Sequence, residues 1–288
     1  MNLTYQATSD HIKTHRQIYL LVGLIAVLNL GILWDLVADW IRDDNYSHGF
    51  LVIPIAAWLF WRKRDTLVFP AESSKLGLLV VLAGSVGIIF GVAASEYFTT
   101  RFSLVLMVTG VSLYYLGLEN FRKVWFSFVF LLFMIPIPAI IYFSATLPMQ
   151  LMASKVTVVL LETVGVPVSR SGNIIYLPDF VLEVAEACSG LRSLVTLLAL
   201  GAIYGNLYLP GRVLPIILFV ATVPIAIVTN VFRIFVTAIG AYAISKELAE
   251  DFLHEISGMI VFVSALILML ILGSIMKWIR KLSLSSSS

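Results

Sequence analysis

The chain has 288 residues, of which 60% are hydrophobic and 12% are charged, and its mean hydropathy is +0.98. These values exclude a soluble domain of this length and predict an all-α polytopic membrane protein. The formal net charge of +2 is too small to indicate a nucleic-acid partner, and the single cysteine excludes an internal disulfide bond.

The apolar segments predict about eight transmembrane helices in a single membrane domain over residues 1–288. Apolar runs of roughly 17 to 25 residues are long enough to cross the hydrocarbon core as helices. The expected spans cover residues 18–37, a shorter run from 49 to 61, then 76–94, 102–118, 124–143, 190–206, a long run from 213 to 244, and 256–276. Residues 1–17 form a polar tail without a cleavage site, so the first span is expected to remain as an anchor. Pro136 and Pro138 are expected to kink the fifth span or to unwind its end.

The pattern changes over residues 144–187. Residues 149–164 are apolar but interrupted by Gln150, Lys155 and Glu162, which favours an interfacial or re-entrant helix. Residues 173–178 and 180–186 alternate in polarity on either side of a Pro-Asp pair, which predicts a short β-hairpin. This segment leads the chain to its only cysteine.

Counting basic residues predicts the orientation. With the N-terminus inside, twelve of the nineteen Lys and Arg residues fall on cytoplasmic segments, including the compact cluster Arg62-Lys63-Arg64. The positive-inside bias therefore favours both termini in the cytoplasm. Residues 144–187, Cys188, Arg233 and His254 then fall on the outer face.

Cys188 lies where a polar segment passes into a long apolar one. If it opens a helix, the free backbone N–H groups and the helix dipole favour its thiolate, and Arg192 one turn later acts in the same direction. A lone cysteine in a hydrophobic protein is more often inert packing, but Glu186, Ser189 and Arg192 make this neighbourhood polar. The pattern predicts a nucleophile.

Arg233 and His254 are predicted at the same face. The seventh apolar run is longer than a bilayer core, so its helix either projects from the membrane or breaks near Thr229 and Asn230, and in both cases Arg233 lies at the boundary. Each residue alone has an ordinary explanation, because basic residues at span ends often extend to the headgroups and an interfacial histidine needs no further role. His48 either lines the same outer cavity or caps the second span.

Together these residues resemble the exosortase/archaeosortase family of membrane-embedded processing enzymes. The resemblance extends from about Ser47 to Trp278. Its motifs are Ala187-Cys188-Ser189-Gly190-Leu191-Arg192-Ser193, Asn230-x-x-Arg233, His254, Ser47-His48-Gly49-Phe50, Gly165-Val166-Pro167-Val168 and Gly172-Asn173.

The resemblance implies a cysteine protease or transpeptidase in the bacterial inner membrane, with its active site facing the periplasm. Its partners would be exported proteins that end in a Pro-Glu-Pro-like motif, a transmembrane helix and a basic tail, and a polysaccharide or lipid-linked acceptor. Cys188 would be the nucleophile, His254 the general acid or base, and Arg233 the oxyanion stabiliser. Arg192 competes for the cationic role, and Ser189, Asn230 and Glu186 are expected to support the site. No cofactor or metal is implied.

Three other functions would require different residues. A zinc protease is excluded, because Gly258 stands where the second histidine of His-Glu-x-x-His is required. A serine intramembrane protease would use Ser189 and a buried histidine. A transporter or lipid carrier with helices broken at Pro136, Pro138 and Pro224 is the main alternative, although transport sites usually keep ionisable groups at mid-depth.

Overall fold

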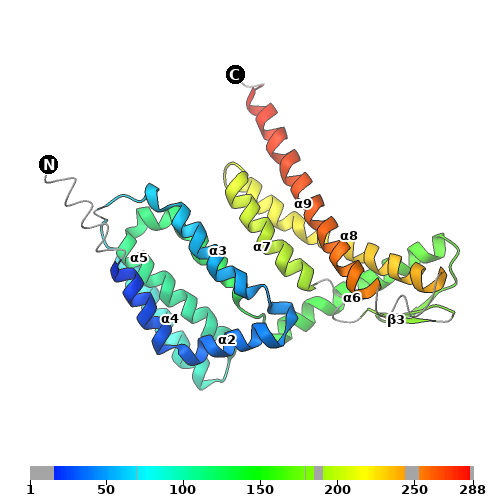
Figure 1. The fold of residues 1–288 in the computed structure, drawn as a ribbon, viewed down its shortest axis with the longest axis horizontal. Coiled ribbons are helices and arrows are strands. Elements are labelled where there is room, and N and C mark those ends of the chain that lie inside the picture. Colours follow the sequence, from blue (N-terminus) through cyan, green and yellow to red (C-terminus); the bar gives the residue numbers. More distant parts are fainter. Residues whose placement is uncertain (1–15, 70, 179, 185–190, 244–252, 286–288) are drawn as a thin grey trace. The chain divides into compact units, whose positions relative to one another are not determined.

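The computed structural model describes residues 16–69, 71–178, 180–184, 191–243 and 253–285 (Figure 1). These residues form a mostly helical chain with one small sheet. The chain divides into two compact units, Met1–Pro138 and Ala139–Ser288. Each unit has its own core and is described separately.

The first unit begins with two helices where one span was predicted over residues 18–37. The helix Arg16–Leu28 and α2 (Leu30–Arg42) meet at an angle of 77°. At the bend, the Nδ2 atom of Asn29 donates a hydrogen bond to the carbonyl of Ile25 at 2.8 Å, which partly satisfies the interrupted backbone. Asparagine favours such local side-chain bonds over a helical interior, and Gly31 follows it. The predicted span is therefore bent, and the two helices together are still long and apolar enough to count as one span.

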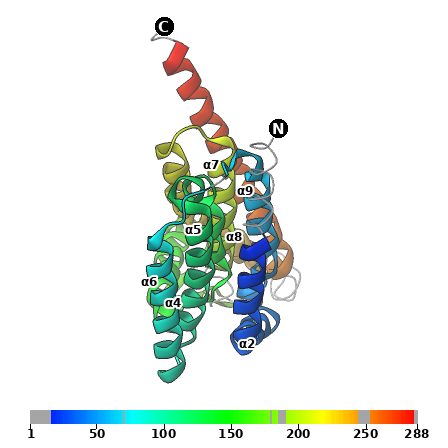
Figure 2. The same ribbon diagram turned by 90° about the vertical axis from the view of Figure 1, so that its left-hand side faces the viewer.

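Glycines bring α4 (Lys75–Ala93) and α5 (Tyr97–Phe130) into close antiparallel contact, and the two helices lie side by side in both views (Figures 1 and 2). Gly77, Gly84 and Gly91 recur every seven residues and face the α5 backbone at Gly110, Ser103 and Thr100. A Cβ atom at Gly84 would lie 2.8 Å from the carbonyl oxygen of Ser103, so only glycine permits this approach.

The second half of α5 follows a kink at Gly117, whose φ of 69° is in the left-handed region that favours glycine. This half packs on α3 (Gly49–Arg62), which follows the short helix η1 (Asp44–Tyr46) and precedes η2 (Arg64–Thr66). A single 3-10 turn, η3 (Leu131–Met134), then ends the helical path before the prolines. The interruption predicted from Pro136 and Pro138 is therefore present.

The second unit contains four long helices and the sheet. They are α6 (Ala139–Thr163), α7 (Leu191–Tyr208), α8 (Val213–Ala243) and α9 (Leu253–Ser285). The prediction of an interfacial or re-entrant helix over residues 149–164 is not met, because these residues form the second half of α6, which is continuous, apolar and long enough to cross a membrane. Gln150 is buried within the unit, whereas Lys155 and Glu162 are on the exposed side.

The sheet has three short antiparallel strands, β1 (Ser169–Ser171), β2 (Ile174–Tyr176) and β3 (Val181–Glu183), in that order. The sequence predicted two longer strands here, and β1 was not expected. One face is buried, because Ile175 and Val184 are fully inaccessible and pack in a cluster with Val231 and Ile234 of α8. The sheet is thereby anchored on α6 and α8.

The prediction of about eight transmembrane helices is met only in its general form. Within the described residues, five helices are long and apolar enough to cross a membrane, and six if the bent pair at Asn29 counts as one span. The apolar part of α7, Ser193–Tyr208, is shorter than a full span, and so is α3. The chain is a multi-pass, mainly α-helical membrane protein, and the number eight stays a prediction.

Candidate functional site

A long apolar helix carries two of the predicted site residues in the second unit. Asn230 and Arg233 lie on α8 with only 5% and 9% of their surfaces exposed. The helix is continuous through both residues and has 31 residues, so it is about 46 Å long and exceeds the thickness of a bilayer core. Burying an arginine in such a helix is costly, and buried ionisable groups in membrane helices usually have a function.

The guanidinium of Arg233 lies against α9. A Cβ atom placed on Gly258 would lie 3.5 Å from Nη2 and 3.6 Å from Cζ of Arg233. These distances are ordinary van der Waals contacts, so the guanidinium lies beside Gly258 and a larger side chain there would meet it. His254 is four residues earlier, so its backbone position is one turn away on the same side of α9. The helix face that receives Arg233 is therefore the face that carries position 254.

The packing of α7 on α8 sets the level of Arg233 relative to the start of α7. A Cβ at Gly205 would be 3.0 Å from Cα of Pro215, and one at Gly201 would be 2.8 Å from Oγ1 of Thr222, so the two helices are antiparallel. Arg233 lies eleven residues beyond Thr222, about 16 Å along the axis, and Leu191 lies ten residues before Gly201, about 15 Å in the same direction. Arg233 is thus level with the first turn of α7, whose first residue follows Cys188 by three positions.

Two hydrogen bonds fix the end of the sheet, four residues before Cys188. The backbone N–H of Val184 donates to the carbonyl of Asn173 at 2.9 Å, and Nδ2 of Asn173 donates to the carbonyl of Val184 at 3.2 Å. Arg170 and Ser154 both donate to the carbonyl of Gly172, at 2.6 and 3.1 Å, and tie the adjoining turn to α6. The chain therefore leaves the sheet from a well-anchored position.

The structure describes only some of the predicted site residues. Asn230 and Arg233 are both described and both buried in α8. Cys188, Ser189 and Glu186 lie outside the described residues. Arg192 and His254 belong to α7 and α9, but their side chains also lie outside the described part of the chain. The site assignments therefore stay predictions.

His48 belongs to the first unit and contacts the interrupted segment after η3. Its Nε2 atom forms a hydrogen bond with the carbonyl of Phe133 at 3.0 Å, and its side chain does not cap α3. Burial lowers the pKa of His48 below its usual 6.5, although hydrogen bonds to Phe133 and Asn45 oppose this. Nε1 of Trp40 donates to Met134 O at 2.9 Å, and the Tyr46 hydroxyl donates to Ile137 O at 3.4 Å.

The side chains of Trp40, Tyr46 and His48 therefore form hydrogen bonds with carbonyls that the proline break leaves without helical partners. The sequence indicated the break but gave no signal for the residues that hold it.

No group of three or more His, Cys, Asp or Glu side chains that could hold an ion occurs within the described ranges.

Comparison with known proteins identifies one family. A sequence profile described as transmembrane exosortase matches residues 40–271, which is most of the chain. The match includes Cys188, Arg233 and His254, and it excludes the N-terminal helix and the basic C-terminal end. No curated protein and no solved structure shows significant similarity to the chain.

Proposed function

Because the chain belongs to the transmembrane exosortase family, we propose that it is a membrane-embedded cysteine protease or transpeptidase that processes the C-terminal sorting signals of exported proteins. The observation that carries the proposal is the placement of Arg233. Its buried guanidinium is level with the start of α7 and lies on the face of α9 that carries position 254. Because the first residue of α7 follows Cys188 by three positions, we infer that Cys188, Arg233 and His254 meet at this end of the second unit.

The proposed reaction proceeds through a thioester. The thiolate of Cys188 attacks the carbonyl carbon of the scissile peptide bond, and the carbonyl oxygen becomes an oxyanion that Arg233 stabilises. The C–N bond then breaks as His254 protonates the leaving amine, which leaves the acyl group on the sulfur. Water or an acceptor nucleophile, deprotonated by His254, attacks the thioester and releases the thiolate.

Guanidinium chemistry suits the electrostatic role. Arginine stays protonated when it is partly dry, whereas a buried lysine loses its charge more readily. A preorganised charge in a water-poor site also stabilises a developing oxyanion more strongly than it would in water. Arg192 remains a competing residue for this role, and Ser189, Asn230 and Glu186 are proposed to support the site.

We place this end of the unit at the outer, periplasmic surface, with both termini in the cytoplasm. The opposite end supports the assignment, since a Cβ at Gly211 in the α7–α8 loop would lie 3.6 Å from the guanidinium of Arg280. Arg212, Lys277 and Lys281 are exposed close to these residues in sequence. A basic cluster at one end of a helical unit is typical of its cytoplasmic side.

The test is processing of a co-expressed substrate that ends in a Pro-Glu-Pro-like motif, a transmembrane helix and a basic tail. Cys188→Ala is expected to insert normally and to leave the substrate at full length, as judged by its intact mass. Cys188→Ser is expected to retain little activity, because a serine hydroxyl is not readily ionised. Ser189→Ala tests the serine alternative: because Ser189 is proposed only to support the site, this variant is expected to process the substrate more slowly but not to lose activity. Normal processing by both Cys188 variants would overturn the proposal, and loss only in Ser189→Ala would indicate a serine mechanism.

A further inference from the structure

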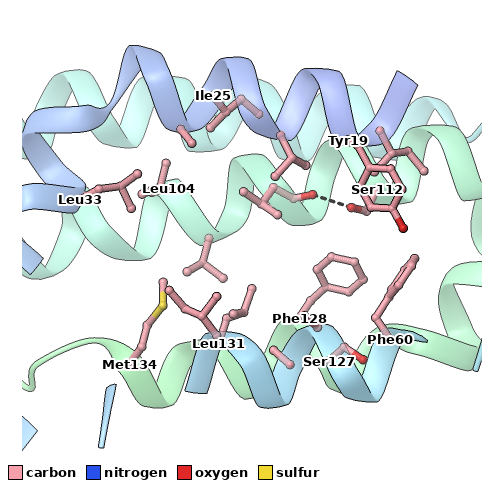
Figure 3. A pocket seen from close by; sticks show the side chains of 18 residues that line it. Tyr19, Ile25, Leu33, Phe60, Leu104, Ser112, Ser127, Phe128, Leu131 and Met134 are labelled. Carbon is pink, nitrogen blue, oxygen red and sulfur yellow. Dashed lines mark hydrogen bonds between the residues drawn. The ribbon is translucent and has the colours of Figure 1, made fainter. Parts of the chain in front are cut away.

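The first unit contains an apolar cavity of about 400 Å³ between the helix Arg16–Leu28, α3 and α5. Eighteen residues line it, and all but Tyr19, Ser112 and Ser127 are apolar. The hydroxyl of Ser112 donates to the carbonyl of Val108 at 2.9 Å within its own helix (Figure 3). Protein interiors are close-packed, and an apolar cavity does not hold water. The cavity therefore suits an apolar guest.

The lining indicates a long guest. Leu104 and Ser112 both line the cavity and are eight residues apart on α5, which corresponds to about 12 Å along the helix. Figure 3 shows Leu33, Leu104 and Met134 toward one end, and Tyr19, Ser112 and Phe60 toward the other. An elongated apolar space of this kind, in a protein surrounded by lipid, matches a hydrocarbon chain.

Basic residues lie next to the end of the cavity that contains Phe60. Arg62-Lys63-Arg64 begins two residues after Phe60, and Lys123 is one turn from the lining residue Ser127. The guanidinium of Arg62 lies 5.5 Å from the Trp58 ring, and that of Arg64 lies 4.1 Å from the Trp61 ring.

Arg64 also contacts Asp65 at 3.4 Å, an exposed pair that leaves the cluster positive overall. Exposed tryptophans beside basic residues are typical of a membrane interface, and such clusters attract anionic headgroups.

We propose that the first unit binds one anionic phospholipid, with an acyl chain in the cavity and the phosphate at the Arg62-Lys63-Arg64 cluster. The acyl chain completes the packing between the helix Arg16–Leu28, α3 and α5. The basic cluster contributes both to the orientation of the chain and to the recognition of this lipid. The proposal does not depend on the reaction proposed for the second unit.

Native mass spectrometry of the full chain tests the headgroup site. The protein is released from membranes that contain equal amounts of phosphatidylglycerol and phosphatidylethanolamine, and the bound lipids are counted. The wild type is expected to keep one phosphatidylglycerol. The triple variant Arg62→Gln/Lys63→Gln/Arg64→Gln is expected to lower the preference for that lipid by about fivefold per neutralised charge. The control Arg212→Gln/Lys277→Gln/Lys281→Gln removes three basic residues of the second unit and is expected to leave it unchanged. The proposal would be contradicted if both variants lost the preference for phosphatidylglycerol equally, or if the Arg62/Lys63/Arg64 variant kept it.

A phosphatidylglycerol analogue with a photoreactive group in its acyl chain tests the cavity in the wild-type protein. Crosslinks are expected to concentrate on residues 53–60 and 104–112, and Ala56→Phe, which fills the cavity, is expected to reduce them at least fivefold. Crosslinks that are spread evenly over lipid-facing helices, α9 included, would overturn the proposal. The crosslink map of the wild-type protein tests the cavity site even if Ala56→Phe does not fold.

Discussion

Two buried arginines, one in each unit, illustrate two different uses of the same side chain. Arg101 in the first unit donates from Nη2 to Oδ2 of Asp39 at 2.6 Å, and its side chain is 5% exposed. Arg233 in the second unit is similarly buried, and its guanidinium lies beside Gly258 of α9. Arg101 joins α5 to α2 through a carboxylate, whereas Arg233 lies beside α9 and level with the first turn of α7.

The ion pair with Asp39 gives Arg101 a structural role. A buried arginine that is neutralised by a carboxylate has a sufficient structural explanation. Arg233 lies against the side of α9 that carries position 254 and is level with the first turn of α7, where the reaction is proposed to occur. We therefore expect substitutions of Arg101 to change stability and substitutions of Arg233 to change activity.

The largest expected effect is that of Arg233→Gln. Loss of the oxyanion-stabilising charge is expected to lower the processing rate roughly 100- to 1,000-fold, with little change in the amount of folded protein. Arg233→Lys keeps the charge but loses the planar fork, so it is expected to recover only part of the activity. The rate is measured by substrate shortening at equal enzyme levels. If Arg192→Gln costs more than Arg233→Gln, the oxyanion role belongs to Arg192.

Gly258 offers a graded test of the same site. Gly258→Ala places its Cβ in ordinary contact with the Arg233 guanidinium and is expected to keep most of the activity. Gly258→Leu is expected to displace the guanidinium and to lower the rate at least tenfold, about 1.4 kcal/mol in activation free energy. Gly273→Ala is a control on the same helix. A Cβ there would overlap the Tyr204 ring, so this variant is expected to disturb the packing of α9 on α7 without touching Arg233. Equal activity in Gly258→Leu and the wild type would exclude a close role for this contact.

Arg101→Ala is expected to act on stability. It leaves Asp39 without its partner, and because Asp39 is partly exposed we expect a loss of about 1–3 kcal/mol. The measurement is the thermal midpoint of the purified chain, together with activity per folded molecule. A loss of activity without a change in the midpoint would contradict the structural role.

His48 gives the smallest expected effect, through pH. Its pKa is lower in the folded state, so the unfolded chain binds more protons between the two pKa values, and stability falls as the pH drops below about 6.5 toward the folded pKa. His48→Gln is expected to flatten the dependence of the thermal midpoint on pH between 7 and 5. An unchanged slope in this variant would assign the dependence to other groups.

Much of the helical architecture could be predicted because bilayer thickness limits the length of apolar segments. The pattern located the helices around residues 76–94 and 213–244 and the break at Pro136 and Pro138. It did not reveal the bend at Asn29, which depends on a side-chain bond to the backbone, or the continuity of α6. Gln150 suggested an interrupted helix, yet it is buried in the unit, and one-dimensional hydropathy cannot distinguish this from exposure to lipid.

The candidate site was less predictable in its geometry than in its residue types. The sequence suggested Arg233 through its position at the end of an apolar run, but the contact with Gly258 depends on how α8 packs on α9. The same limit applies to Trp40 and Tyr46, whose hydrogen bonds to Met134 and Ile137 join segments about 90 residues apart.

The most direct test of the central claim is an intact-mass measurement of the enzyme after it is mixed with substrate in the absence of an added acceptor. We predict a wild-type species that carries the N-terminal part of the substrate on Cys188, that is released by hydroxylamine, and that accumulates more slowly in Arg233→Gln. Substrate that is shortened at the wild-type rate with no thioester detectable on Cys188, even after rapid acid quenching, would contradict the account.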